Sequence, residues 1–158
     1  MVFREAGPQD VRGIFELSNH PSVRQASFNR SPITWSEHCE WFDRTRREPL
    51  CGFYVMEIGG ALAGQIRFRS EGTLATVSIS IDPRHRGKGV GASLYHQALA
   101  AFRARHPVSE VVAKIRKENT GSAAFFSGLG FAVHSIEWIN GQEAIVMRGK
   151  PENPEVSL

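Results

Sequence analysis

The amino-acid sequence predicts a single domain of the α/β (α+β) class, with a mixed central sheet of about seven strands flanked by about four helices. A chain of 158 residues suits one domain with a sizeable core. Its hydrophobic content of 41% and charged content of 22% are ordinary for a globular protein. The stretch 73–118 has the pattern strand, helix, strand, and such a crossover pairs its two strands in parallel.

The N-terminal third predicts one strand and two helices. Residues 2–5 are predicted to form a short strand, and Pro8 suits the start of the first helix, where its missing N–H costs nothing. Residues 22–31 are polar without a clear period, which predicts a loop. The pair Thr34 and Glu37 has the spacing of a capping box, so a second helix begins there, with an aromatic face.

The rest of the chain alternates strands with two further helices, and residues 1–150 form the domain. Gly59-Gly60 predicts a hairpin turn, and residues 151–158 suggest a flexible tail. The remaining elements follow in order: strands over 52–58, 61–69 and 73–81, a helix that Pro107 ends, a strand over 108–115, a short helix from Asn119 to Leu129, and two strands joined at Asn140-Gly141.

The composition favours a small anionic ligand. A net charge of +3, scattered along the chain, is too weak for a nucleic-acid interface. Cys39 and Cys51 fit no zinc spacing, and no other metal cluster is apparent, so no metal is expected. No leader opens the chain and no apolar run approaches about 20 residues, so we expect a cytoplasmic protein without membrane contact.

The stretch from Ile81 to Leu94 carries the strongest functional signal. A β-branched run ends at Pro83, a basic glycine-rich turn follows, and a good helix-forming segment comes next. A helix N-terminus offers free N–H groups and a positive dipole end, which together bind anions. Glycines allow the backbone to approach a phosphate closely. The stretch predicts a phosphate or pyrophosphate site.

Two common phosphate motifs do not fit this stretch. The dinucleotide fingerprint needs a third glycine where Leu94 stands, and the NTPase loop needs Ser or Thr after Lys88, where Gly89 stands. A glycine-rich surface connection without a ligand is the other interpretation of the glycines alone.

The pattern Arg86-x-x-Gly89-x-Gly91-Ala92 resembles the acyl-CoA pyrophosphate loop of GCN5-related N-acetyltransferases, the GNAT family. The segment from Asn119 to Phe131, with its paired phenylalanines and final Gly-Phe, resembles a second region of that family. The predicted order of strands and helices also looks like that fold.

The resemblance implies a splayed pair of strands, 76–81 and 111–115, with the pantetheine arm of acetyl-CoA between them. The backbone of Ile79, Ser80 and Ile81 would hold the pantetheine, and an N–H near Ile81 would meet the oxyanion. Asn119 would face the pantetheine or its thioester. The pyrophosphate would be bound by the side chain of Arg86 and the backbone of Gly87, Lys88, Gly89, Val90, Gly91 and Ala92.

The chemistry that the resemblance implies is direct attack of a neutral primary amine on the thioester. His38 is the leading candidate for the base because histidine titrates near neutrality, although a packing role on an aromatic helix face is the alternative. The family commonly has Tyr, as the acid, where this chain has Phe126, which would pack against the thioester. A catalytically silent acyl-CoA-binding module therefore stays open.

The run 18–42 looks like a subgroup that acetylates the 4-amino group of UDP-linked dideoxy sugars on the way to pseudaminic acid. A nucleotide sugar is then the expected acceptor; a protein N-terminus, an amino acid or an antibiotic are the alternatives. The family often dimerises, so a homodimer is one expectation. The candidate acceptor residues are Arg24 and Arg30 for a diphosphate, Ser27 and Asn29 for hydroxyls or amides, and Phe28 for stacking.

Overall fold

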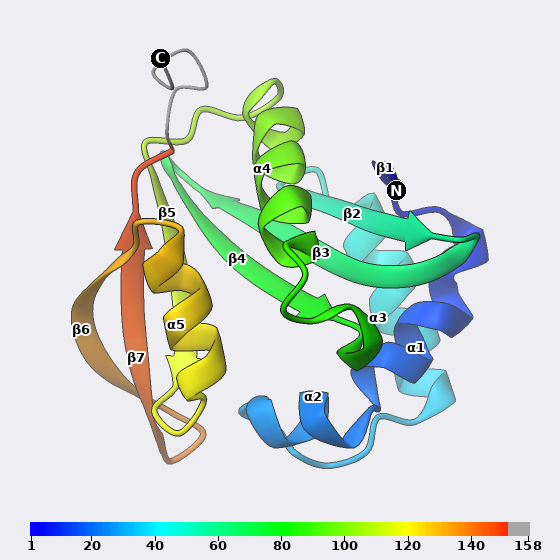
Figure 1. Cartoon of the computed structure of the whole chain (residues 1–158), viewed down its shortest axis with the longest axis horizontal. Coiled ribbons are helices and arrows are strands. Elements are labelled where there is room, and N and C mark those ends of the chain that lie inside the picture. The colour runs from blue at the N-terminus through cyan, green and yellow to red at the C-terminus, as the bar shows by residue number, and fades with distance from the viewer. Residues whose placement is uncertain (152–158) are drawn as a thin grey trace.

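A computed structural model of the chain describes residues 1–151, so nearly all of the predicted tail lies outside the described residues. The fold is a seven-stranded mixed sheet in the order β1-β2-β3-β4-β5-β7-β6 (Figure 1), which confirms the predicted fold class. The strands are β1 (Val2–Glu5), β2 (Cys51–Ile58), β3 (Ala61–Glu71), β4 (Leu74–Ile81), β5 (Glu110–Arg116), β6 (Ala132–Ile139) and β7 (Gln142–Gly149).

Five α-helices accompany the sheet within the described residues, together with 3-10 turns at Pro8–Asp10 and Pro83–His85. The helices are α1 (Val11–Ser18), α2 (Pro21–Ala26), α3 (Trp35–Arg47), α4 (Val90–Arg103) and α5 (Thr120–Gly128).

The helix α2 lies where the sequence predicts a loop over 22–31, so that prediction is wrong for its first half. Pro21 occupies the first helical turn, where its missing N–H costs nothing. The side chain of His20 caps the helix, with Nδ1 accepting from the backbone N–H of Ser22 at 3.2 Å. A proline directly after a capping residue was therefore the missed signal.

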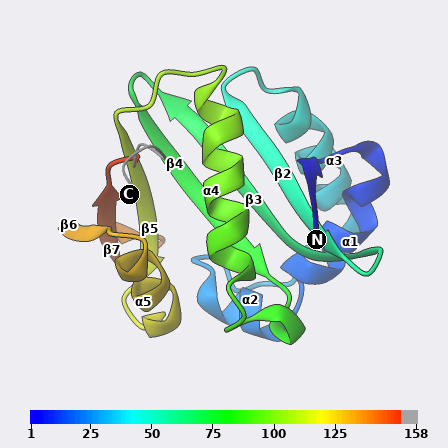
Figure 2. The same cartoon turned by 45° about the horizontal axis from the view of Figure 1, so that its top comes forward.

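The helices cover both faces of the sheet. Helix α4 crosses one face, while α1 and α3 lie on the other (Figure 2). Along β3, Ile66 and Phe68 point into the main core with α4, because successive side chains of a strand alternate between its faces. Gln65 and Arg67 consequently lie on the face that α3 covers, where the guanidinium of Arg67 sits over the Trp41 ring.

Strands β4 and β5 separate after a short parallel contact. They pair only where Leu74–Thr76 faces Glu110–Val112, while β3 stays paired with β4 from Leu74 to Ile81. The two strands diverge beyond that contact (Figure 1). Within residues 1–151, the segment 77–81 thus has a strand on one side only, which confirms the splay that the family resemblance implies.

His38 belongs to a second core between α1, α3 and β2. Its side chain is 1% exposed, and its Nε2 donates to the backbone carbonyl of Val11 at 2.7 Å. Aromatic rings enclose it, namely Phe15, Trp35, Trp41 and Phe42. Burial lowers the pKa of His38 below its ordinary value, and the bond to Val11 opposes that shift only in part. His38 is therefore neutral at pH 7.

We predict that His38 makes folding stability depend on pH. The unfolded chain binds a proton at this residue below about pH 6.5 and the folded chain binds it only at lower pH, so the free energy of unfolding falls as the pH falls through this range. The slope from this residue is at most about 1.4 kcal/mol per pH unit. Urea unfolding between about pH 7.5 and 5.5 should show a steeper loss in the wild type than in His38→Gln. Equal slopes for the two proteins would contradict a buried neutral imidazole.

Candidate functional site

The glycine-rich connection leads from the end of β4 into the first turn of α4. Gly87 has φ +72° and Gly89 has φ +80°, the left-handed region that glycine adopts without strain. A Cβ at either position would meet no atom within 4 Å, so the backbone of the loop is open to solvent. These two glycines are needed for backbone conformation and not for close packing.

The loop presents a set of free hydrogen-bond donors. The backbone N–H groups from Gly87 to Ala92 form no well-aligned hydrogen bond with any described residue. The Arg86 side chain donates through Nε to the Ile81 carbonyl at 3.0 Å, and neither Arg86 nor exposed Lys88 has a carboxylate partner in residues 1–151. Free N–H groups, a helix N-terminus and two unpaired cations together suit a pyrophosphate.

The register of β4 decides which backbone groups face the gap. The N–H of Asp82 donates to the Ala63 carbonyl at 2.8 Å, and hydrogen-bonded pairs alternate along an antiparallel ladder. The N–H groups of Ile79 and Ile81 consequently point toward the open edge, while that of Ser80 points toward β3. Of the three residues predicted to hold pantetheine, Ile79 and Ile81 therefore have free N–H groups and Ser80 does not.

Helix α5 lies against the start of α4. A Cβ on Gly91 would come within 2.9 Å of the Phe125 ring, so glycine is needed there for close packing. Asn119 is the predicted N-cap, with Oδ1 accepting from Ser122 N at 3.2 Å and Nδ2 donating to Ser122 Oγ at 2.9 Å. Phe126 is 4% exposed, and its ring centroid lies 5.0 Å from that of Phe131. Asn119 and Phe126 thus have evident structural partners.

The predicted acceptor residues lie in α2 and the loop after it, where several contact one another. Arg24 donates to the carbonyls of Ser18 at 2.7 Å and Asn29 at 2.8 Å, and Ser27 Oγ donates to the Val23 carbonyl. The Arg24 guanidinium therefore organises its own loop, which argues against its predicted role in binding a diphosphate. Arg30 is exposed.

Two side chains from the other half of the sheet hold this loop. Arg116, at the end of β5, donates to the Gln25 carbonyl, and Gln142, at the start of β7, donates to the Phe28 carbonyl at 2.7 Å. Residues 20–34 therefore span from α1 to β5 and β7 below the parted strands (Figure 1). We call this segment the strap.

The surroundings of His38 do not suit its predicted role as the base. Its ring is enclosed in the second core and its Nε2 hydrogen is held by Val11, so the burial argues against contact with an incoming amine. The residue is a packing element of α3.

A row of polar side chains that the sequence-based site did not include lies on the α3 side of β3 and β4. Gln65 faces Ser80 and Arg67 faces Ser78 across the two strands, and Arg67 Nη2 donates to Ser78 Oγ at 2.9 Å. The alternation of polar and apolar residues in 65–68 was the signal that could have identified their common face. We call these four residues the polar row.

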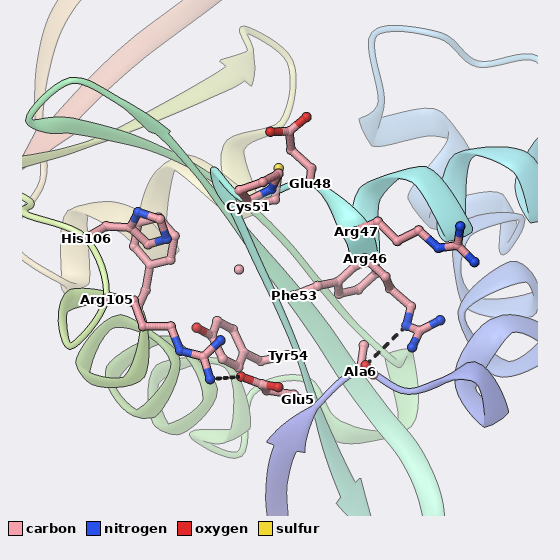
Figure 3. Close-up of a pocket in the computed structure, with 13 residues that line it drawn as sticks. Glu5, Ala6, Arg46, Arg47, Glu48, Cys51, Phe53, Tyr54, Arg105 and His106 are labelled. Carbon is pink, nitrogen blue, oxygen red and sulfur yellow. Dashed lines mark hydrogen bonds and ion pairs between the residues drawn. The ribbon is translucent and has the colours of Figure 1, made fainter.

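A cavity of about 220 Å³ lies at the far end of α4 from the loop (Figure 3). Two arginines that line it already have partners: Arg105 pairs with Glu5 at 3.0 Å, and Arg46 donates to the Ala6 carbonyl at 3.4 Å. No residue of the glycine loop or of the parted ends of β4 and β5 lines the cavity, so it is separate from the donor site.

Residues 1–151 contain neither a helix that could span a membrane nor a cluster that could bind a metal. No helix there is long and apolar enough to cross a membrane. No group of three or more His, Cys, Asp or Glu side chains in that part of the chain could hold a metal ion.

Comparisons with known proteins agree with this geometry. The family described as "Acetyltransferase (GNAT) domain" matches residues 1–132. The L-methionine sulfoximine/L-methionine sulfone acetyltransferase of Salmonella typhimurium is 30% identical over 84% of this chain and 81% of its own. The L-amino acid N-acyltransferase MnaT of Escherichia coli is 30% identical over 84% and 80% of the two chains.

More distant relatives share part of the chain or the fold. The chain spans 41% of the mycothiol acetyltransferase of Thermobispora bispora, with 25% identity over 77% of its own length. The crystal structure of a phosphinothricin acetyltransferase from Sinorhizobium meliloti in complex with AcCoA superposes with a TM-score of 0.78 at 21% identity, covering 94% of this chain and 87% of that one. The match over residues 1–132 places the chain in the GNAT family, and it is an acetyl-CoA-dependent N-acetyltransferase.

Proposed function

We propose that the chain transfers the acetyl group of acetyl-CoA to the primary amine of a small acceptor of the amino-acid class. The observation that carries this proposal is the 30% identity, over about four fifths of each chain, to enzymes named for L-methionine sulfoximine, L-methionine sulfone and L-amino acids. The open loop and the parted strands supply a donor site that fits the same chemistry.

In this proposal the donor is held by the loop and by the open edge of β4. The free N–H groups of Gly87–Ala92, with Arg86 and Lys88, bind the pyrophosphate. The pantetheine amides pair with the free edge at Ile79 and Ile81 as an added strand would. The N–H of Ile81 is the candidate donor to the oxyanion of the tetrahedral intermediate.

The chemical step needs a neutral amine and a leaving thiolate. The amine nitrogen attacks the thioester carbon, the C–S bond breaks, and the sulfur keeps the electron pair. A thiol has a pKa near 8.5, so the thiolate leaves readily and takes its proton from solvent. Phe126 supplies no proton and instead packs the core beside Phe131. Because the predicted base His38 is buried, we assign the deprotonation of the amine to solvent as well.

The competing acceptor is a UDP-linked 4-amino sugar. It is suggested by the resemblance of residues 18–42 to the subgroup that acetylates such sugars. Acetylation of a protein N-terminus and silent binding of acyl-CoA also compete with the amino-acid assignment. We expect thiol release from acetyl-CoA with methionine sulfone and phosphinothricin, and none with a UDP-4-amino sugar or an N-terminal peptide. Thiol release only with the sugar would overturn the amino-acid assignment, and no release with any acceptor would favour the silent module.

We predict that the glycine loop determines the affinity for acetyl-CoA. Arg86→Ala removes a charged partner of the pyrophosphate, and Gly89→Asp adds an anion at a backbone position with φ +80°. Each substitution should raise the KM for acetyl-CoA by roughly 10- to 100-fold in steady-state assays. Arg103→Ala, an exposed arginine in the last turn of the same helix, is the matched control and should leave that KM unchanged. An unaltered KM in both loop variants would remove the loop from the donor site.

A further inference from the structure

The polar row lies where an acceptor must arrive. Helix α4 and the main core cover one face of β3 and β4. Helices α1 and α3 cover the opposite face only in part, since Ser78 is exposed there and Arg67 is half-buried. Gln65, Arg67, Ser78 and Ser80 lie on that opposite face, and the two serines belong to the part of β4 with an open edge.

The charge of Arg67 is unmatched. Its guanidinium lies 4.6 Å from the ring centroid of Trp41 and 5.8 Å from that of Phe53, and its one hydrogen bond in the described residues goes to the uncharged Ser78. Burial lowers the pKa of Arg67 to about 10, so it is still a cation at neutral pH. By contrast, Arg4 is paired with both Asp10 and Glu57.

Gln65, two residues before Arg67 on β3, offers a hydrogen-bond acceptor beside that cation. The residue is 3% exposed, and its Oε1 is buried without a hydrogen-bond partner in residues 1–151. A buried carbonyl oxygen of this kind costs stability unless a donor reaches it. Its cross-strand neighbour Ser80 lies between Ile79 and Ile81, whose N–H groups face the gap.

The spacing of Gln65 and Arg67 suits one small molecule. Alternate residues on a strand are about 6.8 Å apart, and the two long side chains can converge from that separation. Once the Gln65 side chain turns toward Ser80, an amine hydrogen can reach its Oε1 while an anionic group two or three bonds away reaches the guanidinium. An α-amino acid has that arrangement, whereas a nucleotide sugar carries its amine far from its phosphates.

We propose that Gln65 and Arg67 form the acceptor subsite and select amines that carry a nearby carboxylate. This inference rests on the proposed function and names how the same site recognises its acceptor. Arg67 holds the carboxylate, and Gln65 accepts one N–H of the neutral amine, so that the nitrogen lone pair is directed at the thioester carbon between β4 and β5.

The test compares methionine sulfone with its carboxamide as acceptors. We expect the wild type to favour the free acid in kcat/KM by roughly 30-fold or more, because a buried charge pair is lost with the amide. Arg67→Gln should bring the preference to near one and leave the KM for acetyl-CoA unchanged. Arg69→Gln, an exposed arginine on the same face of β3, is the matched control and should keep the wild-type preference.

The outcomes separate the two proposals. If the wild type acetylates neither compound nor any other amino acid, the proposed acceptor class fails together with the subsite. If it acetylates methionine sulfone and Arg67→Gln keeps the full preference for the free acid, the subsite alone is overturned. Should Arg67→Gln fail to fold, Arg67→Lys keeps the charge and must keep most of the preference.

Discussion

The end of the pairing between β4 and β5 after Thr76 is the constraint on which the site depends. Backbone groups left without a partner in a buried sheet are costly, so a protein keeps such a gap only when something else fills or frames it. Here Phe125 packs against Gly91 at the first turn of α4 on one side. On the other side the strap is held by Arg116 and Gln142. The gap is therefore built into the fold and does not result from an irregular strand end.

The pattern of ion pairs leaves free cations beside this gap. Asp82 has its pKa lowered to about 2 by hydrogen bonds from Arg84, so Arg84 is occupied next to the loop. Arg86 and Lys88 have no carboxylate partner in the described chain, and neither has Arg67 on the opposite face of the sheet. These three cations thus fall into two groups separated by β4. Two anions that approach from opposite faces would each find one group.

The sequence predicts the features that depend on neighbouring residues in the chain. It does not predict those that depend on tertiary contacts between side chains. Seven strands and the glycine loop follow from periodicity and from turn residues. The burial of His38 could not be predicted, because a histidine on an aromatic helix face has the same spacing whether it packs or reacts. The bonds of Arg24 to its own loop join residues whose contact depends on how the strap folds. The alternation of residues in β3 predicts which face Arg67 lies on, but only the tertiary structure could reveal that no carboxylate from residues 1–151 pairs with it.

The register of β3 against β4 connects the two sides of the site. A shift by one residue would turn the N–H groups of Ile79 and Ile81 toward β3 and would move Ser78 and Ser80 to the α4 face. Gly64 permits the observed register, because the side chain of Ile81 lies directly over it: a Cβ there would come within 2.6 Å of Ile81 Cδ1 and 3.0 Å of the Ser80 carbonyl. Because a larger residue at 64 would displace Ile81, a single glycine in β3 helps to set both the donor edge and the polar row. The two substrate sites are therefore not independent features of the sequence, since one strand register positions both.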